Sequence, residues 1–128
     1  MNAPISYFSL AVLTAFLLLG CNREPGAAVE GQLPEALPPA QASTQIEKTF
    51  AANTDAWIKT TAQAAAKALK ELHYDAAYAA LQQLKVSGKL TPEEDMAVRN
   101  AILGNSVAGT KAMERGDAKA AEMMKNIR

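Results

Sequence analysis

The chain has 128 residues and a single cysteine, and its 13 basic and 13 acidic side chains cancel at neutral pH. A balanced charge gives no electrostatic reason to bind nucleic acid, and one cysteine allows neither an internal disulfide nor a thiolate metal site. Alanine supplies 27 residues, which favours helix but buries little area, so we expect one small helical domain with a thin core.

The chain opens with its only long apolar run. No charged residue occurs from Ile5 to Gly20. The run has the length of the hydrophobic region of a signal peptide, and it is shorter than the roughly 20 residues of a membrane-spanning helix. It ends in Leu18-Leu19-Gly20-Cys21, which resembles the lipobox of bacterial lipoprotein signal peptides. The alternatives are an ordinary secretory signal and a short uncleaved anchor.

The lipobox resemblance implies that residues 1–20 are removed by cleavage between Gly20 and Cys21. It also implies that Cys21 carries a diacylglycerol and that its new amino group receives a fatty acid such as palmitate. Several acyl chains make a durable membrane anchor. By the same resemblance, Asn22 in place of Asp favours the outer membrane, facing the periplasm, over the inner membrane.

Residues 21–43 contain the lipidated cysteine and a stretch rich in Pro, Ala, Gly and Gln without apolar periodicity. Such a composition is typical of a flexible, disordered tether. We therefore expect three segments: the signal peptide 1–20, the tether 21–43 and a helical domain 44–128.

Helical periodicity begins at about Thr44. Between residues 45 and 71 one stripe recurs at helical spacing, formed by Ile46, Phe50, Trp57, Thr61, Ala65, Ala68 and Leu72. The spacing predicts a helix over 45–71. Asn53-Thr54-Asp55 are capping residues, so we expect a kink or break there.

A second helix follows the corner at His73-Tyr74-Asp75 and ends at Gly88, which suits a left-handed position. Thr91-Pro92-Glu93-Glu94 then predicts the start of a third helix with a capping box. Its apolar stripe would be Met96, Leu103, Val107 and Thr110, with Ile102 and Val98 beside it. Gly104 indicates either a close helix crossing or a break, and a last helix is expected over 118–126.

Within residues 69–92 the chain resembles the second half of a tetratricopeptide-type helical hairpin. Tyr74, Ala77, Leu81 and Leu84 hold the positions of the aromatic, small and large apolar residues, while Leu72 stands where that family usually has Gly. The resemblance implies helical-hairpin geometry, and no ligand-binding residue is carried over from that family. The predicted fold is therefore all-α, a bundle of three or four helices.

Two groups of residues invite a chemical interpretation. Gly104 to Lys111 is close to a phosphate-binding loop, but Thr110 precedes Lys111 and no strand is predicted before it, so we expect helix and no nucleotide. Glu71, His73 and Asp75 gather at a corner, where solvated or capping roles are usual. Without a second histidine or a thiolate they also make no metal site, and we expect no enzyme and no cofactor.

The candidate interaction residues are Phe50, Trp57, Met123 and Met124. Each has a structural alternative, since Trp57 and Phe50 suit a core and the methionines, Met113 included, suit pliable core filler. The leading hypothesis is a non-catalytic, lipid-anchored envelope protein that presents a helical surface to another envelope protein. The alternative is a lipoprotein whose Ala-rich helix binds or perturbs the bilayer, and a third possibility is an unrecognised enzyme.

Overall fold

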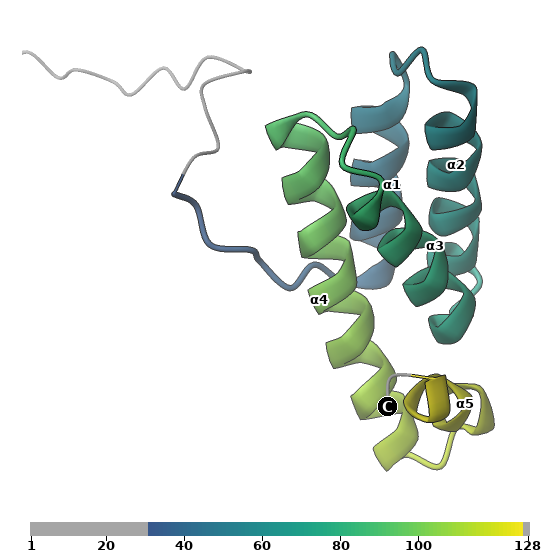
Figure 1. Cartoon of the computed structure of the whole chain (residues 1–128). Helices are drawn as coiled ribbons and strands as arrows, with labels where there is room; N and C mark the ends of the chain where they lie inside the picture. The colour runs from purple at the N-terminus through teal and green to yellow at the C-terminus, as the bar shows by residue number, and fades with distance from the viewer. Residues whose placement is uncertain (1–30, 127–128) are drawn as a thin grey trace, which may run out of the picture.

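The computed structural model describes residues 31–126, and within them the chain is all-helical (Figure 1). The helices are α1 (Pro39–Phe50), α2 (Ala56–Lys70), α3 (Tyr74–Val86), α4 (Pro92–Glu114) and α5 (Ala118–Asn126). The predicted helical bundle is confirmed. The described part has five helices rather than three or four, because the helix expected over 45–71 is two helices.

Helix α1 begins at Pro39, six residues before the predicted start at 45. A proline at the first helical position needs no hydrogen-bond partner for its nitrogen, and its fixed φ suits a helix. Residues 39–43, which composition had assigned to the tether, are thus the first turn of α1. Ala42 and Ser43 are fully buried there, and the Ser43 hydroxyl donates to the Ala66 carbonyl of α2 at 2.8 Å.

Helices α1 and α2 form a hairpin rather than one kinked helix. Asn53 Oδ1 accepts from the Asp55 N–H at 2.9 Å, and Asp55 Oδ1 in turn accepts from the N–H groups of Trp57 and Ile58. These bonds satisfy the donors at the start of a new helix. The chain therefore reverses at residues 51–55, and α2 runs back beside α1 (Figure 1).

The remaining helices continue this up-and-down plan. Helix α4 packs against both α1 and α3, which closes a four-helix bundle, and α5 lies across the ends of α3 and α4 (Figure 1). The large core side chains include Ile46, Ile58, Leu69, Leu81, Leu84 and Val98. Alanines fill most of the space between them. A second, smaller cluster of Tyr74, Ala112 and Ala120 attaches α5, with Met113 packed against it.

The buried face of α4 is not the one predicted. Leu103 and Val107 are each 40 % exposed. Apart from Val98, the buried residues are small or polar: Glu94, Ala97, Asn100, Ala101, Gly104, Asn105, Gly109 and Ala112. The helix is continuous through Gly104, so the predicted break does not occur, and the segment that approaches Gly104 closely is the backbone at Leu37 ahead of α1 rather than a second helix. A Cβ at position 104 would overlap the Leu37 carbonyl, so only glycine allows this approach.

Residues 31–38, called the strap below, precede α1, and Glu35 and Leu37 of this segment contact the flank of α4. The Glu35 N–H donates to Asn100 Oδ1 at 2.8 Å, and the Leu37 backbone lies against Gly104 one turn further along. The part of the predicted tether that the structure describes is thus joined to the body. Residues 21–30 of the predicted tether and the predicted signal peptide, residues 1–20, lie outside the described residues.

The predicted turn after α3 and the predicted capping box at the start of α4 are confirmed. Thr91 and Glu94 form a reciprocal capping box, and Gly88 and Gly116 have φ values of 66° and 82°. Leu72, which replaces the usual glycine, has φ 55°. It ends α2 in a Schellman motif, in which the His73 N–H donates to the Ala68 carbonyl at 2.9 Å.

Candidate interaction surfaces

The structure separates the two aromatic residues that the sequence had placed on one stripe. Phe50 is 2 % exposed and belongs to the core, which is the structural alternative that the sequence offered for it. Trp57, in the first turn of α2, is 49 % exposed and lies outside the core. The two residues differ because the predicted stripe was drawn through the hairpin turn. Cys21 and the side chains of Met123 and Met124 lie outside the described residues.

The cluster at the α2–α3 corner is an exposed turn. His73 Nδ1 lies 3.4 Å from Glu71 Oε2, and both side chains are more than 40 % exposed. Asp75 lies in the first turn of α3, where a carboxylate interacts favourably with the helix N-terminus. The geometry fits the solvated role that the sequence suggested, while His73 at the N-cap of α3 makes no side-chain capping hydrogen bond.

A buried carboxylate joins the two turns at the opposite end of the bundle. Glu94 is 6 % exposed, and its Oε2 accepts from the Thr91 N–H at 2.9 Å while its Oε1 accepts from Asn53 Nδ2 at 2.6 Å. The capping box alone was visible in the sequence. Glu94 therefore caps α4 and also holds the α1–α2 turn, and these bonds occupy both of its oxygens.

Asp55 lies beside this junction, in a polar hollow of about 450 Å³ that also includes Asn53, Lys89 and Glu93. The N–H of Ile58 is the main group that lowers the pKa of Asp55 below its ordinary value, and Lys89 and the Trp57 N–H act in the same direction. Lys89 Nζ lies 3.4 Å from Asp55 Oδ2. The arrangement favours the ionised cap and ties the α3–α4 turn to α2.

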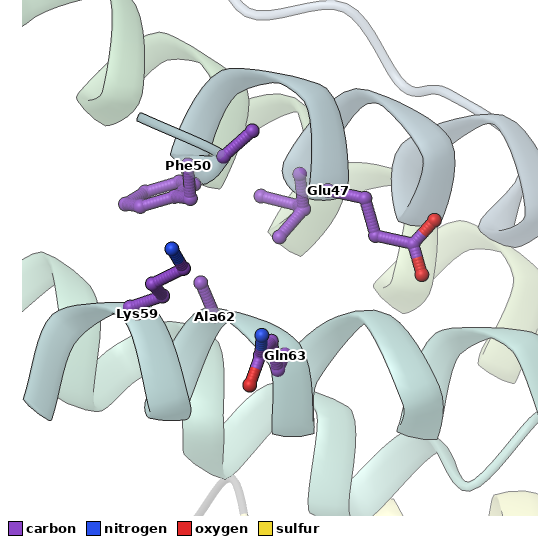
Figure 2. A pocket seen from close by; sticks show the side chains of 7 residues that line it. Glu47, Phe50, Lys59, Ala62 and Gln63 are labelled. Atoms are coloured by element: carbon purple, nitrogen blue, oxygen red, sulfur yellow. The ribbon is translucent and has the colours of Figure 1, made fainter. Parts of the chain in front are cut away.

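A second hollow, of about 380 Å³, lies between α1 and α2 (Figure 2). Ile46 and Phe50 form its buried floor, and the small side chain of Ala62 leaves the space open. Figure 2 shows Lys59 extending from α2 toward Phe50, with Gln63 beside Ala62. The hollow is thus apolar at its base and polar at its rim, and it could accept one side chain of a partner.

Two exposed apolar side chains, Leu103 and Val107, lie one turn apart on α4, on the side away from the bundle. We call this side the outer face: Met96, Arg99, Leu103, Val107, Thr110 and Glu114. At 100° per residue these positions fall within an arc of about 80°. Its C-terminal half borders a hollow of about 380 Å³ lined by Ser106, Val107, Thr110, Lys111 and Glu114. Single exposed apolar residues are ordinary on a protein surface. Leu103 and Val107, however, lie on adjacent turns of one helix and form a continuous patch.

Within residues 31–126, no group of three or more His, Cys, Asp or Glu side chains is placed to hold a metal ion. None of the helices in this range is both long and apolar enough to cross a bilayer. Comparisons of the chain with models of known protein families, with curated proteins and with solved structures find no match.

Proposed function

We propose that the protein is a lipid-anchored component of the bacterial cell envelope whose helical body binds another protein through the outer face of α4. The observation that carries the binding role is the pair Leu103 and Val107, each 40 % exposed on a helix that is rigidly packed along its opposite side. A rigid helix that presents apolar side chains suits recognition of a partner helix or groove.

The proposed location depends on Leu18-Leu19-Gly20-Cys21. Cys21 precedes the strap by ten residues, so a fully extended chain spans at most about 35 Å between lipid and strap. With that reach the body stays close to the bilayer, and the outer face is presented to proteins of the same membrane. The outer membrane, facing the periplasm, is the proposed site.

Mass spectrometry of the mature N-terminus tests the anchor. We expect an acylated Cys21 as the first residue and recovery of the protein in the membrane fraction. A Cys21→Ser chain should lose the lipid mass and leave that fraction. Recovery of unmodified Cys21 with residues 1–20 still attached would disprove the anchor.

A photoreactive residue at Thr110, which is exposed on the outer face, tests the binding role. We expect a specific cross-linked product in intact cells from this position. The same probe at Ala64, exposed on α2, serves as the control and should give none. Equal labelling from both positions would contradict a binding role for the outer face.

The alternative, in which the Ala-rich helix acts on the bilayer, receives less support from the fold. Ala62, Ala65, Ala66 and Ala68 of α2 are at most 7 % exposed because α2 packs between α1 and α3. An inserting helix would need an apolar face of its own. In α2 that face is already used in the core.

A further inference from the structure

We propose that residues 35–37 of the strap form a latch, which detaches from α4 and docks again while helices α1 to α5 stay folded. The small number of contacts in the strap, the separate attachment of α1 and the prolines of the strap support this proposal. The latch concerns the strap alone, so it holds whether or not the outer face binds a protein.

Few contacts hold the strap. Within the described part of the chain, the bond from the Glu35 N–H to Asn100 Oδ1, at 2.8 Å, is the one hydrogen bond that joins residues 31–37 to the helices. Leu37 is partly buried and packs against the main core cluster, whereas Leu33 is 90 % exposed. One hydrogen bond and one partly buried side chain contribute about as much free energy as the ordering of a few residues costs in entropy. The docked and released states should therefore lie close in free energy.

The first turn of α1 is held by contacts that do not involve residues 31–37. The Ala42 N–H donates to the Pro38 carbonyl at 2.9 Å. The Ser43 hydroxyl donates to the Ala66 carbonyl of α2 at 2.8 Å, and Ala42 and Ser43 are both fully buried. Because these contacts do not depend on the latch, α1 can keep its place when the latch leaves α4 and the chain pivots ahead of Pro38.

Prolines keep the released strap extended. Leu33, Leu37 and Pro38 each precede a proline, and a residue in that position is restricted to extended conformations. The released strap therefore has fewer conformations to lose on docking than an ordinary loop has. The site on α4 also stays formed, because the helix is continuous through Gly104. Both properties favour repeated docking over permanent release.

The flank of α4 tolerates the departure of the latch. The Asn100 side chain, 8 % exposed in the docked state, becomes open to water, which can replace the Glu35 N–H as its donor. Release also uncovers the flank at Gly104, which is next in the chain to Leu103 of the outer face. The latch therefore sets how much of α4 is open to other molecules.

Native-state hydrogen exchange of the full chain in detergent, with urea added below the unfolding transition, tests the latch. We expect the Glu35 amide to be protected about 10- to 1000-fold and to change its exchange rate by less than about twofold in 1 M urea, because release exposes little surface. The Ala101 amide, within α4, should exchange more slowly and should speed up about tenfold per molar urea. Equal rates and equal urea dependence at the two amides would show that the strap leaves only when the bundle unfolds. That result, or no protection at Glu35, would overturn the inference.

Leu37→Ala and Leu33→Ala form a matched pair, since the same change is made at a partly buried and at a 90 % exposed position. Leu37→Ala should raise the exchange rate of the Glu35 amide about fivefold, and Leu33→Ala should leave it within about twofold of the original. A glutamyl-specific protease gives a second measurement, in which cleavage after Glu35 should be at least about tenfold faster than cleavage after Glu47 within α1. The product that begins at Ala36 should keep the helical circular dichroism of the full chain. Equal cleavage at the two sites, or an equal effect of the two leucine changes, would contradict the latch.

Discussion

Leu72 shows how one residue can carry strain that its neighbours enforce. Its φ of 55° lies in the left-handed region, where a side chain costs about 1–2 kcal/mol. The Schellman bonds at the end of α2 require that conformation. Because Leu72 is 47 % exposed, its side chain recovers only part of the cost through packing.

We predict that Leu72→Gly raises the free energy of unfolding by about 0.5–1 kcal/mol, as glycine adopts this conformation without strain. Urea denaturation is the measurement. Leu103→Gly is the matched control, because it places glycine within a regular helix, where it should lower stability by about 1 kcal/mol. A loss of stability in Leu72→Gly would show that side-chain packing outweighs strain.

Asp55 makes the stability of the bundle sensitive to acid. The Ile58 N–H, followed by Lys89 and the Trp57 N–H, lowers the pKa of Asp55 in the folded state below 3.8. The folded state therefore binds this proton less readily than the unfolded chain. The stabilisation is complete above the unfolded pKa and is lost as pH falls through the lower, folded pKa.

Asp55→Asn isolates this effect, since asparagine also caps helices but does not ionise. We expect the melting temperature of the original protein to exceed that of Asp55→Asn at pH 7, and the difference to shrink below about pH 4. Thermal unfolding followed by circular dichroism is the measurement. A difference that stays constant across this pH range would exclude the ionised cap as its source.

At the residue scale, hydrogen bonds between residues close in the sequence could be predicted, and hydrogen bonds between distant residues could not. The Thr91–Glu94 capping box spans three residues, so its pattern is visible in the sequence. Asn53 and Glu94 are 41 residues apart, and nothing in either neighbourhood indicates that they meet. A glutamate that serves both as a cap and as a bridge looks like an ordinary cap in the sequence.

At the element scale, Glu94 connects two hairpin turns. We predict that Glu94→Gln lowers the free energy of unfolding by about 1–2 kcal/mol, because its amide nitrogen must face one of the two donors and leaves it unpaired. Glu93→Gln, the exposed neighbour, is the control and should change stability little. Chemical denaturation measures both. Equal effects would show that the Glu94 bonds add nothing beyond the charge near the helix start.

Gly104 sets the distance between the strap and α4. We predict that Gly104→Ala lowers stability by about 1–3 kcal/mol, although alanine favours helix, because its Cβ would displace the Leu37 backbone. Hydrogen exchange at the Glu35 amide should become faster as its bond to Asn100 is lost. Thr110→Ala, exposed on the same helix, should leave that amide protected. An unchanged Glu35 amide in Gly104→Ala would contradict the close contact.

The helices themselves were predictable where periodicity and caps agreed, as in α3 and at the start of α4. The buried face of α4 and the start of α1 were predicted wrongly because both depend on contacts with distant parts of the chain. The sequence method assigns large apolar residues to the core, whereas α4 buries its small residues so that neighbouring backbones approach closely. Residues 39–43 were likewise assigned to the tether by composition, since their burial depends on Ala66 and the rest of α2.

For the whole molecule, the fold gives a direct test of the bilayer alternative. We predict that the mature chain with Cys21→Ser is helical in water and that anionic vesicles do not change its circular dichroism, because α2 is already packed on two sides. A chain unfolded in water that gains helicity with vesicles would favour the alternative. Neutral vesicles provide the control for scattering.

The bundle as a whole was predictable because each helix carries its own pattern. Which residues are exposed could not be predicted, since the exposure of Leu103, Val107 and Trp57 depends on how the helices pack against one another. The role of Cys21 still depends on its motif alone.

The strap also determines how the molecule responds to load. A force applied from the N-terminal side reaches the Glu35–Asn100 hydrogen bond before the Leu37–Gly104 contact. We therefore expect these two contacts to break in that order. Release of residues 35–38 lengthens the free chain ahead of α1 by up to about 14 Å while α1 to α5 stay folded. We thus expect the strap to detach from α4 at a lower force than the one that unfolds the bundle.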